Sequence, residues 1–333
     1  MTSSHIFESL HGGTDAQGAA PHDFSTNANA CGPCPGTRLA LQRVDAGRYP
    51  DPLYSTLRER LAHFHQVEVR RIVIAASASE FIGRITAAVA QGDSRRVWVP
   101  RHCYGDYLRA ASAWRFEPEP EAGAADLVWC CDPSSPLGQA GELAEIVMRL
   151  RAEATCVLDL AYEPLRLRGS LALGRDRLDR VWQLWTPNKA LGLTGIRAAY
   201  AIAPVDAADM ATRLERLAPS WPLGAHGVAL LESWTSESTQ KWLGKSRLKL
   251  GVWEAEQREL CESLGWVCEP SVASYFCAKP DVPYSGARVS ELRAEGIKLR
   301  DTASFGIPGH VRLGVLSPAS QVALQRAWIA SRS

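Results

Sequence analysis

Lys189 lies in a segment whose residue types could together carry out chemistry on a carbonyl group. The segment reads Trp185-Thr-Pro-Asn-Lys-Ala-Leu-Gly-Leu-Thr-Gly-Ile-Arg197 and directly follows an apolar run typical of a strand. A lysine amine that is desolvated by its surroundings becomes a nucleophile and forms a Schiff base with a carbonyl carbon. A lone lysine beside a turn is usually a solvated surface group, so the interpretation depends on its neighbours.

Asp159 is the first such neighbour, thirty positions before the lysine, in Cys156-Val-Leu-Asp159-Leu-Ala-Tyr162. A carboxylate at the end of an apolar strand is costly to bury without a cationic partner. The protonated pyridine nitrogen of pyridoxal phosphate (PLP) is such a partner, and the carboxylate makes the ring an electron sink. Tyr162 could hydrogen-bond the ring's phenolic oxygen. An ordinary aspartate at the carboxyl edge of a sheet is the alternative interpretation.

A phosphate site is indicated by small and polar residues. Ala76-Ser-Ala-Ser-Glu80 follows an apolar run and opens a helical pattern, so backbone N–H groups and the Ser79 hydroxyl could reach a phosphate at a helix N-terminus. Thr186 and Asn188, which flank the lysine, would add hydroxyl and amide donors. Arg197 would add a cationic contact.

The elements that must position these residues alternate between apolar runs and helical patterns. Apolar runs stand at 72–75, 96–99, 127–131, 156–160 and 181–185, and helical patterns stand at 54–65, 80–89, 107–113 and 143–152. This alternation predicts an α/β fold with a large domain, whose mainly parallel sheet is flanked by helices. The residues expected above to bind PLP lie in this domain, so we expect it to be the PLP-binding domain.

A second, smaller α+β domain is predicted beyond about residue 205. Helical patterns at 210–217 and 225–256 are followed by strand-like runs at 266–269, 274–278, 297–300 and 310–315, and by a helix at 318–330. We therefore expect an N-terminal arm that is part of the small domain (1–40), the large domain (41–208), and linking helices with the small C-terminal domain (209–333).

Composition narrows the class of protein. The 333 residues are 46% hydrophobic with a formal net charge of +1 and no long run of one sign, so neither a nucleic acid nor a membrane is an expected partner. No apolar stretch reaches membrane-spanning length and the start lacks the pattern of a signal peptide, so a cytoplasmic enzyme is expected. The nine cysteines are expected to be free thiols. Cys31 and Cys34 have no second pair at metal-binding spacing, so no metal is expected, and Pro33 and Pro35 predict a loop there.

Taken together, the motifs resemble the fold-type I aminotransferase superfamily, in its histidinol-phosphate aminotransferase branch. Asp159-Leu-Ala-Tyr162 and Lys189 with Gly192-Leu-Thr-Gly-Ile-Arg197 carry the resemblance. Asp132-Pro-Ser-Ser-Pro-Leu-Gly138 stands where the branch has Asn-Pro-x-Asn-Pro-Thr-Gly, and Tyr49-Pro-Asp-Pro52 repeats a motif of the branch. The motifs occur in the expected order over nearly the whole chain.

The resemblance implies a role for each matching residue. Lys189 would hold PLP as a Schiff base and later move protons, and Asp159 would pair with the pyridinium. Tyr162 would bond the phenolic oxygen, and Tyr104 would stack on the ring. The cofactor's phosphate would be held by Ala78, Ser79, Thr186, Asn188 and Arg197. Tyr49 would reach that phosphate from a neighbouring subunit, so a homodimer is expected.

Two departures from the branch's motifs concern the cofactor. Ser135 takes the place of the asparagine that usually bonds the phenolic oxygen, and its shorter hydroxyl would tune the Schiff-base pKa differently. Pro187-Asn188 stands where the family commonly has an aromatic residue and a serine. Neither change removes an essential group, but both leave the reaction open.

The N-terminal segment resembles one group within the branch, the cobalamin-pathway threonine-phosphate decarboxylases. That group begins with His-Gly-Gly and Asp-Phe-Ser-x-Asn-x-Asn, as in His11-Gly-Gly13 and Asp23-Phe-Ser-Thr-Asn-Ala-Asn29. The resemblance implies that His11, Asn27, Arg300 and Arg312 bind the phosphate and carboxylate of the substrate, with Arg312 clamping the α-carboxylate.

Three functions follow as hypotheses. The first is a decarboxylating lyase that resembles threonine-phosphate decarboxylase and acts on a phosphorylated amino acid. The second is an aminotransferase that resembles histidinol-phosphate aminotransferase. The third is a catalytically silent relative that binds PLP. The same residues serve the first two, because the outcome depends on which bond at the substrate's α-carbon stands perpendicular to the ring.

Overall fold

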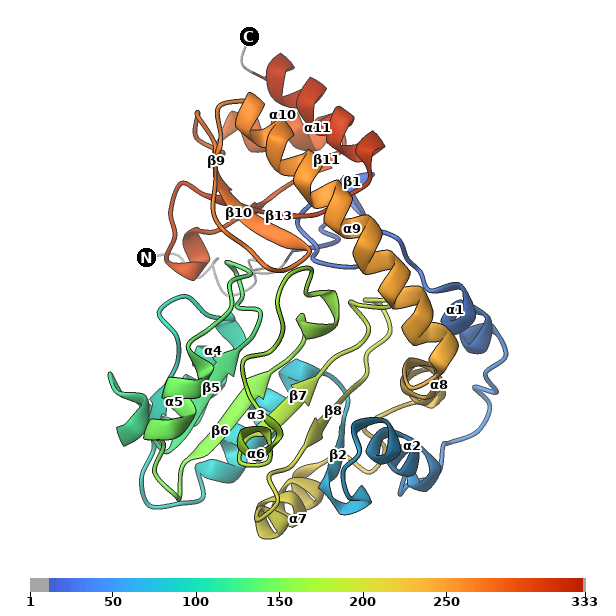
Figure 1. Ribbon diagram of the computed structural model, residues 1–333, viewed down its shortest axis with the longest axis vertical. Helices are drawn as coiled ribbons and strands as arrows, with labels where there is room; N and C mark the ends of the chain where they lie inside the picture. Colours follow the sequence, from blue (N-terminus) through green and yellow to red (C-terminus); the bar gives the residue numbers. More distant parts are fainter. Residues whose placement is uncertain (1–11, 332–333) are drawn as a thin grey trace.

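A seven-stranded sheet forms the centre of the larger part of the computed structural model, which describes residues 12–331 (Figure 1). Its strand order is β2-β8-β7-β6-β5-β3-β4. The strands are β2 (Ile72–Ala75), β3 (Arg96–Trp98), β4 (Glu117–Pro118), β5 (Leu127–Cys131), β6 (Thr155–Asp159), β7 (Trp182–Trp185) and β8 (Ala199–Ile202). Only β8 runs against the others, between β2 and β7. The mainly parallel sheet is confirmed, and β8 is a strand that the sequence patterns did not predict.

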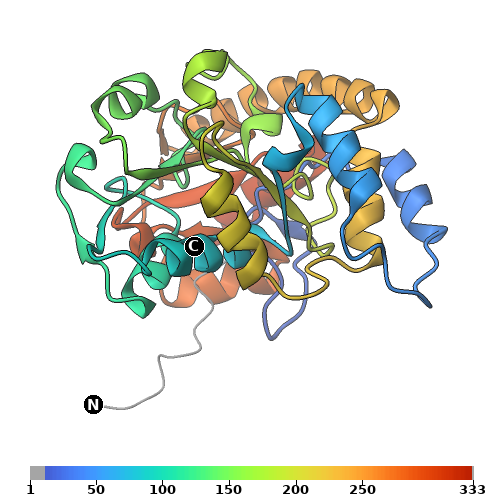
Figure 2. The same cartoon turned by 90° about the horizontal axis from the view of Figure 1, so that it is seen from below.

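Both faces of this sheet are covered by helices, because side chains along a strand point alternately to opposite sides. On β5, Leu127 and Trp129 pack on one side, whereas Val128 and Cys130 pack on the other. The first face is covered by α3 (Ala78–Val89), α4 (Gly105–Ala113) and α7 (Ala208–Leu217). The second face is covered by α2 (Ser55–His65), α5 (Leu143–Arg149) and α8 (Ala225–Trp234). The view from below shows helices on both sides of the sheet (Figure 2).

The smaller part is built on a four-stranded antiparallel sheet in the order β12-β13-β10-β9. Its elements are β9 (Val267–Cys268), β10 (Tyr275–Lys279), β12 (Arg300–Asp301), β13 (Val311–Gly314), α10 (Ala287–Ala294), the 3-10 turn η4 (Ala303–Phe305) and α11 (Pro318–Ala330). The long helix α9 (Glu237–Ser263) runs from the larger part to the smaller one (Figure 1). This α+β arrangement agrees with the predicted fold class.

Two local predictions were wrong, and a third holds only in part. The run 297–300 is two short strands, because β11 (Ile297–Lys298) pairs with β1 (His22–Asp23) while β12 pairs with β13. The stretch 225–256 is interrupted, because Ser236 accepts a hydrogen bond from Thr239 N and starts α9 after α8 has ended. The loop predicted around Pro33 and Pro35 ends at Cys34, since α1 (Pro35–Gln42) begins at a proline that suits a first helical position.

Short elements complete the described chain. They are η1 (Val69–Arg71), η2 (Ala122–Ala124), η3 (Glu163–Leu165) and α6 (Arg175–Leu178).

All nine cysteines are free thiols. Within residues 12–331, no three His, Cys, Asp or Glu side chains gather in a way that could hold a metal ion. None of the described helices combines the length and apolarity needed to cross a membrane. The domain boundaries and the cytoplasmic location stay predictions.

Candidate active site

The strand directions bring distant residues to one edge of the large sheet. Side chains that follow β2, β3, β5, β6 and β7 meet there because these strands all point the same way. Arg197 joins them from the other direction, since the antiparallel β8 begins at this same edge. The edge opens into a cavity of about 480 Å³. The predicted site residues of the large part that line it are Ala78, Ser79, Tyr104, Ser135, Asp159, Tyr162, Thr186, Asn188, Lys189 and Arg197.

Asp159 is held at the floor of this cavity by two hydrogen bonds. Tyr107 donates its hydroxyl to Oδ2 at 2.7 Å, and the Ala161 backbone N–H donates to Oδ1 at 2.9 Å. The side chain is almost fully buried, and this burial raises the pKa of the Asp159 carboxyl, while both hydrogen bonds and the positive charge of Lys189 act in the opposite direction. Such a carboxylate is stabilised by any further cation placed in the cavity.

Tyr107 is a site residue that the sequence analysis missed. Its ring stacks on Trp129 with a centroid distance of 4.5 Å, and this packing fixes the hydroxyl that donates to Asp159. Its burial raises the pKa of the Tyr107 phenol, which therefore stays protonated and remains a donor. No local pattern marked it, because its role depends on a contact with a residue 52 positions away in the chain.

Lys189 and Tyr162 face each other across the same floor. The Lys189 Nζ atom lies 5.2 Å from the centre of the Tyr162 ring, within range of a cation–π contact. Tyr162 packs edge-on against Tyr275 at a centroid distance of 4.7 Å, and the Tyr275 hydroxyl donates to Ser134 O at 2.7 Å. A strand of the small sheet thus supports the residue that faces the lysine.

The residues predicted to hold a phosphate lie together at the cavity. Ser77 caps α3 by accepting from Glu80 N at 3.1 Å, and the residues at this helix N-terminus, Ser77, Ala78 and Ser79, line the cavity. Ser79 lies 3.3 Å from the Tyr104 hydroxyl. The Asn188 amide is engaged elsewhere, because its Nδ2 donates to Ile196 O at 3.2 Å within its own loop.

The loop that carries Ser135 is fixed by a buried ion-pair cluster. Arg166 Nη2 lies 2.8 Å from Asp132 Oδ1, and Arg166 Nε donates to Glu163 Oε2 at 2.6 Å. The Arg166 and Asp132 side chains are both nearly inaccessible. An aspartate at position 132 therefore has its own cation beside it.

The opposite end of the cavity belongs to the small part and the N-terminal segment. Arg300 and Arg312 are cross-strand neighbours in the β12–β13 pair, and both line the cavity. Their guanidinium carbons lie 5.1 Å and 5.6 Å from the centre of the Phe305 ring. Burial and the charge of Arg312 lower the pKa of Arg300. Two like charges directly opposite each other are unfavourable without an anion between them.

Unpaired buried groups show that this cavity suits a polar ligand. Both side-chain amide atoms of Asn27, the Thr186 hydroxyl and Arg312 Nε are buried with no hydrogen-bond partner among residues 12–331. All three residues line the cavity. Buried polar groups are nearly always paired, so a ligand with its own donors and acceptors fits here.

Among the described residues predicted for the site, Tyr49 does not line the cavity. Tyr49 is 78% exposed and stacks on Trp221 at a centroid distance of 4.4 Å. His11 lies outside the described residues. Residues that sequence reasoning missed also line the cavity, and they are Gly12, Gly13, Thr14, Ser25, Thr26, Ser77, Tyr107, Cys131, Ala161, Thr194, Gly195, Ala198 and Phe305.

Comparisons with known proteins agree with this architecture. Residues 21–327 match the family described as aminotransferase class I and II. The chain is 26% identical over 330 residues to histidinol-phosphate aminotransferase 2 of Burkholderia mallei, covering 93% of this chain and 92% of the relative.

Two solved structures share the fold. The histidinol-phosphate aminotransferase of Sinorhizobium meliloti, in complex with pyridoxal-5'-phosphate, superimposes with a TM-score of 0.79 at 21% identity and covers 92% of this chain and 90% of that one. The L-threonine-O-3-phosphate decarboxylase of Porphyromonas gingivalis gives a TM-score of 0.79 at 19% identity and covers 93% of this chain and 98% of that one.

Proposed function

The chain belongs to the class I and II aminotransferase family and is a PLP-dependent enzyme, and we propose that it decarboxylates a phosphorylated amino acid of the threonine-phosphate type. The family excludes neither this reaction nor transamination. The proposal therefore rests on the substrate end of the cavity and on the N-terminal segment.

At the cofactor end, we assign the roles that the residue chemistry supports. PLP, when bound, supplies a ring that draws electrons from a bond at the substrate's α-carbon. Asp159 would keep the ring nitrogen protonated, and Tyr107 would hold the Asp159 carboxylate in place. Tyr162 would donate a hydrogen bond to the phenolic oxygen. Lys189 would hold the cofactor covalently through Nζ and, once released, move a proton at the α-carbon.

The rest of the cofactor would be held by the neighbouring loops. Tyr104 would cover one face of the ring, and Ser135 would lie near its phenolic oxygen. The first turn of α3 would receive the phosphate with Ala78 and Ser79, beside Thr186, Asn188 and Arg197. The unpaired Thr186 hydroxyl supports this placement, since a phosphate oxygen would satisfy it.

The single observation that carries the substrate proposal is the Arg300–Arg312 pair. These cross-strand neighbours face one cavity, so they favour a substrate with two anionic ends. A phosphorylated amino acid has a phosphate and a carboxylate, whereas histidinol phosphate has only the phosphate. Asn27, whose amide lacks a partner in the described chain, would bind the same substrate. His11 stays a predicted fourth contact.

Transamination is the second candidate, supported by the name of the curated relative from Burkholderia mallei. Glutamate, a common amino donor, also carries two anionic ends, so the arginine pair is compatible with it. The two candidates differ in which α-carbon bond the bound substrate presents perpendicular to the ring.

The test is to incubate the PLP-loaded enzyme with O-phospho-L-threonine and to measure carbon dioxide and the phosphorylated amino alcohol that remains. In parallel, histidinol phosphate and 2-oxoglutarate are supplied, and glutamate is measured. Carbon dioxide release with no glutamate supports the proposal. Glutamate formation without carbon dioxide would replace it with the aminotransferase.

We also propose that two copies of the chain assemble, with Tyr49 completing the partner's cofactor site. Tyr49 and Leu53 are 78% and 70% exposed, and Tyr49 lies outside the cavity of its own subunit. Light scattering of the purified holoenzyme tests the assembly. A fully loaded monomer would remove this role from Tyr49.

A further inference from the structure

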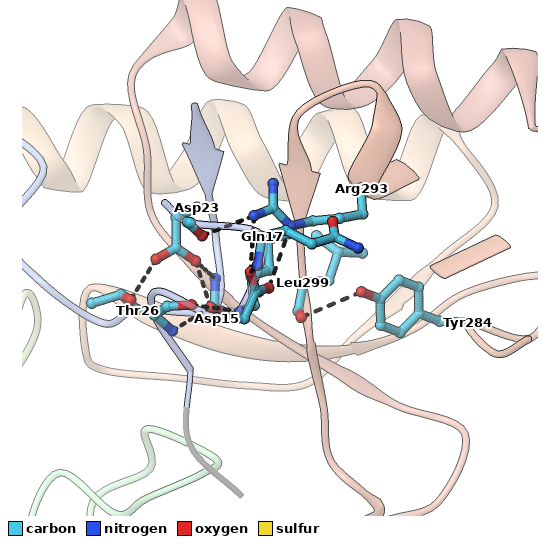
Figure 3. Close-up of polar contacts among 11 residues, drawn as sticks. Asp15, Gln17, Asp23, Thr26, Tyr284, Arg293 and Leu299 are labelled. Carbon is cyan, nitrogen blue, oxygen red and sulfur yellow. Dashed lines mark hydrogen bonds and ion pairs between the residues drawn. The ribbon is translucent and has the colours of Figure 1, made fainter. Parts of the chain in front are cut away.

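One ion-pair cluster joins the N-terminal segment to the small part on the outer side of the cavity. Asp15 Oδ1 lies 3.1 Å from Arg293 Nη2, and Asp15 Oδ2 lies 2.6 Å from Lys298 Nζ. Figure 3 shows the Asp15 carboxylate facing the Arg293 side chain, with the Gln17 backbone turned toward it. Arg293 and Lys298 belong to α10 and β11, so these contacts join residues nearly 280 positions apart.

The same cations also hold the backbone around Asp15. Arg293 Nη2 donates to Gly18 O at 2.9 Å, and Lys298 Nζ donates to Gly13 O at 2.5 Å. The two cations, with Arg293 contributing most, keep the pKa of the Asp15 carboxyl well below its usual range. The segment is thus fixed by charge-assisted hydrogen bonds, which are stronger than neutral ones.

A short chain of hydrogen bonds leads from this cluster to the cavity. Gly13 N donates to Ser25 Oγ at 2.8 Å, and the Ser25 hydroxyl in turn donates to Asp23. Ser25 O accepts from Arg312 Nη2 at 3.1 Å. Gly13 and Ser25 both line the cavity, so Arg312 is oriented by the segment that Lys298 holds.

Steric contacts show how closely this segment fits. A Cβ atom on Gly12 would lie 2.0 Å from Ser25 O, and one on Gly314 would lie 2.6 Å from Thr26 O. At each of these two contacts, the two backbone segments approach each other as closely as a glycine allows. A small shift of the segment would therefore move Ser25, and with it the Arg312 guanidinium.

We propose that Asp15, with Arg293 and Lys298, is a latch that positions the substrate-binding end of the cavity, in particular Arg312 and the Gly12–Thr14 wall. Asp15 itself lines no part of the cavity and is a positioning residue. The identity of the substrate rests on the proposed function, whereas the latch itself does not. Its chemistry requires only that an anion binds beside Arg312.

The side chains of the latch are more buried than those of an ordinary surface ion pair. The Arg293 and Lys298 side chains are only 13% and 16% exposed, and the Asp15 side chain is 33% exposed. The Glu237–Lys241 pair on α9 is 81% and 70% exposed and offers a matched control, because pairs of that kind contribute little.

The test compares three variants of the PLP-loaded enzyme, which are Asp15→Asn, Asp15→Glu and Glu237→Gln. Calorimetry with inorganic phosphate measures anion binding, and amide hydrogen exchange reports on Gly13. Asp15→Asn is expected to weaken phosphate binding about tenfold and to speed Gly13 exchange by a similar factor, since one charge-assisted contact is lost. Asp15→Glu should restore part of both, and Glu237→Gln should change neither.

A role in folding alone is distinguished by two further readouts. With O-phospho-L-threonine, Asp15→Asn should raise KM with little change in kcat, while PLP absorbance and Tm stay near those of the starting protein. Lys298→Gln provides a second route if Asp15→Asn does not fold. Unchanged phosphate binding in a folded latch variant overturns the proposal, as does loss of PLP in that variant alone.

Failure of the proposed function has a different signature. If the starting protein releases no carbon dioxide from O-phospho-L-threonine, the substrate assignment is lost. The phosphate affinity and the Gly13 exchange of Asp15→Asn still decide the latch, because neither measurement requires turnover.

Discussion

The two ends of the cavity are built from different kinds of structure. At the cofactor end, Asp159 is the last residue of β6 and pairs with Leu184 of the adjacent parallel strand β7, after which Lys189 follows in a loop. The Lys189 carbonyl oxygen accepts a hydrogen bond from Asn29 N at 2.9 Å. At the substrate end, Arg312 is oriented through Ser25 on a segment from the other end of the chain. The position of Asp159 depends on strand pairing within one sheet, whereas the orientation of Arg312 depends on a contact between distant segments.

This difference separates cofactor chemistry from substrate choice. A shift of Ser25 is expected to move Arg312 without disturbing Asp159, whose two hydrogen bonds come from α4 and from its own loop. We therefore expect related enzymes to share the residues at the cofactor end and to differ in substrate through changes in the N-terminal segment and in β12. Variants at each end are expected to fail in different ways.

The largest effect is expected from Lys189→Ala at the cofactor end. Loss of the amine removes both the covalent hold on PLP and the proton carrier, so kcat should fall by about a thousandfold or more. Borohydride reduction should no longer fix the cofactor to the protein. An unchanged circular dichroism spectrum serves as the control, and residual turnover within tenfold of the starting enzyme would contradict the assigned role.

A smaller loss is expected from Asp159→Asn, at about 100- to 1000-fold in kcat, because a neutral amide does not hold the ring nitrogen protonated. Tyr107→Phe removes the hydrogen bond that Tyr107 donates to Asp159, and it should lower kcat about tenfold. Stopped-flow absorbance and steady-state rates check both. Equal losses in the two variants would show that Tyr107 contacts the reaction more directly than its bond to Asp159 indicates.

At the substrate end, Arg312→Lys is expected to raise KM about 10- to 100-fold while PLP content stays unchanged. Lysine keeps the charge but cannot form the two parallel hydrogen bonds that a guanidinium gives to a carboxylate. Arg300→Lys provides the cross-strand comparison. If either variant lost cofactor instead of substrate affinity, the division of the cavity into two ends would be wrong.

The sequence indicated residues that line both ends of the cavity, but not the residues that position them, for a physical reason. The residues after β6 and β7 were placed correctly because apolar runs mark strands, and parallel strands share an edge. Tyr107 was missed because its role arises from the hydrogen bond that it donates to Asp159 in the folded chain. Asp15 gave no signal, since only the folded chain brings Arg293 and Lys298 to it. The short β1 and β11 likewise have no pattern that a window of residues could detect.

The smallest expected effect is the response of each region to mild acid. His65, the last residue of α2, contacts the Tyr200 hydroxyl of β8 and has its pKa lowered to about 4 by burial and, to a lesser extent, by Arg175. A depressed pKa means that the unfolded chain binds the proton first. The stability from neutral His65 is therefore present above pH 6.5 and is lost as the pH falls from there to about 4.

The latch is expected to be insensitive to pH within that window. The pKa of Asp15 is lowered by its cations, so its contribution is lost only below the ordinary carboxyl range. Between pH 7 and pH 5 the free energy of unfolding should fall by at most about 1.4 kcal/mol per pH unit from His65, while Gly13 exchange, corrected for its intrinsic pH dependence, stays constant. His65→Gln should flatten the stability profile. Loosening of Gly13 at pH 5 would show that the substrate end is held by a group other than the Asp15 carboxylate.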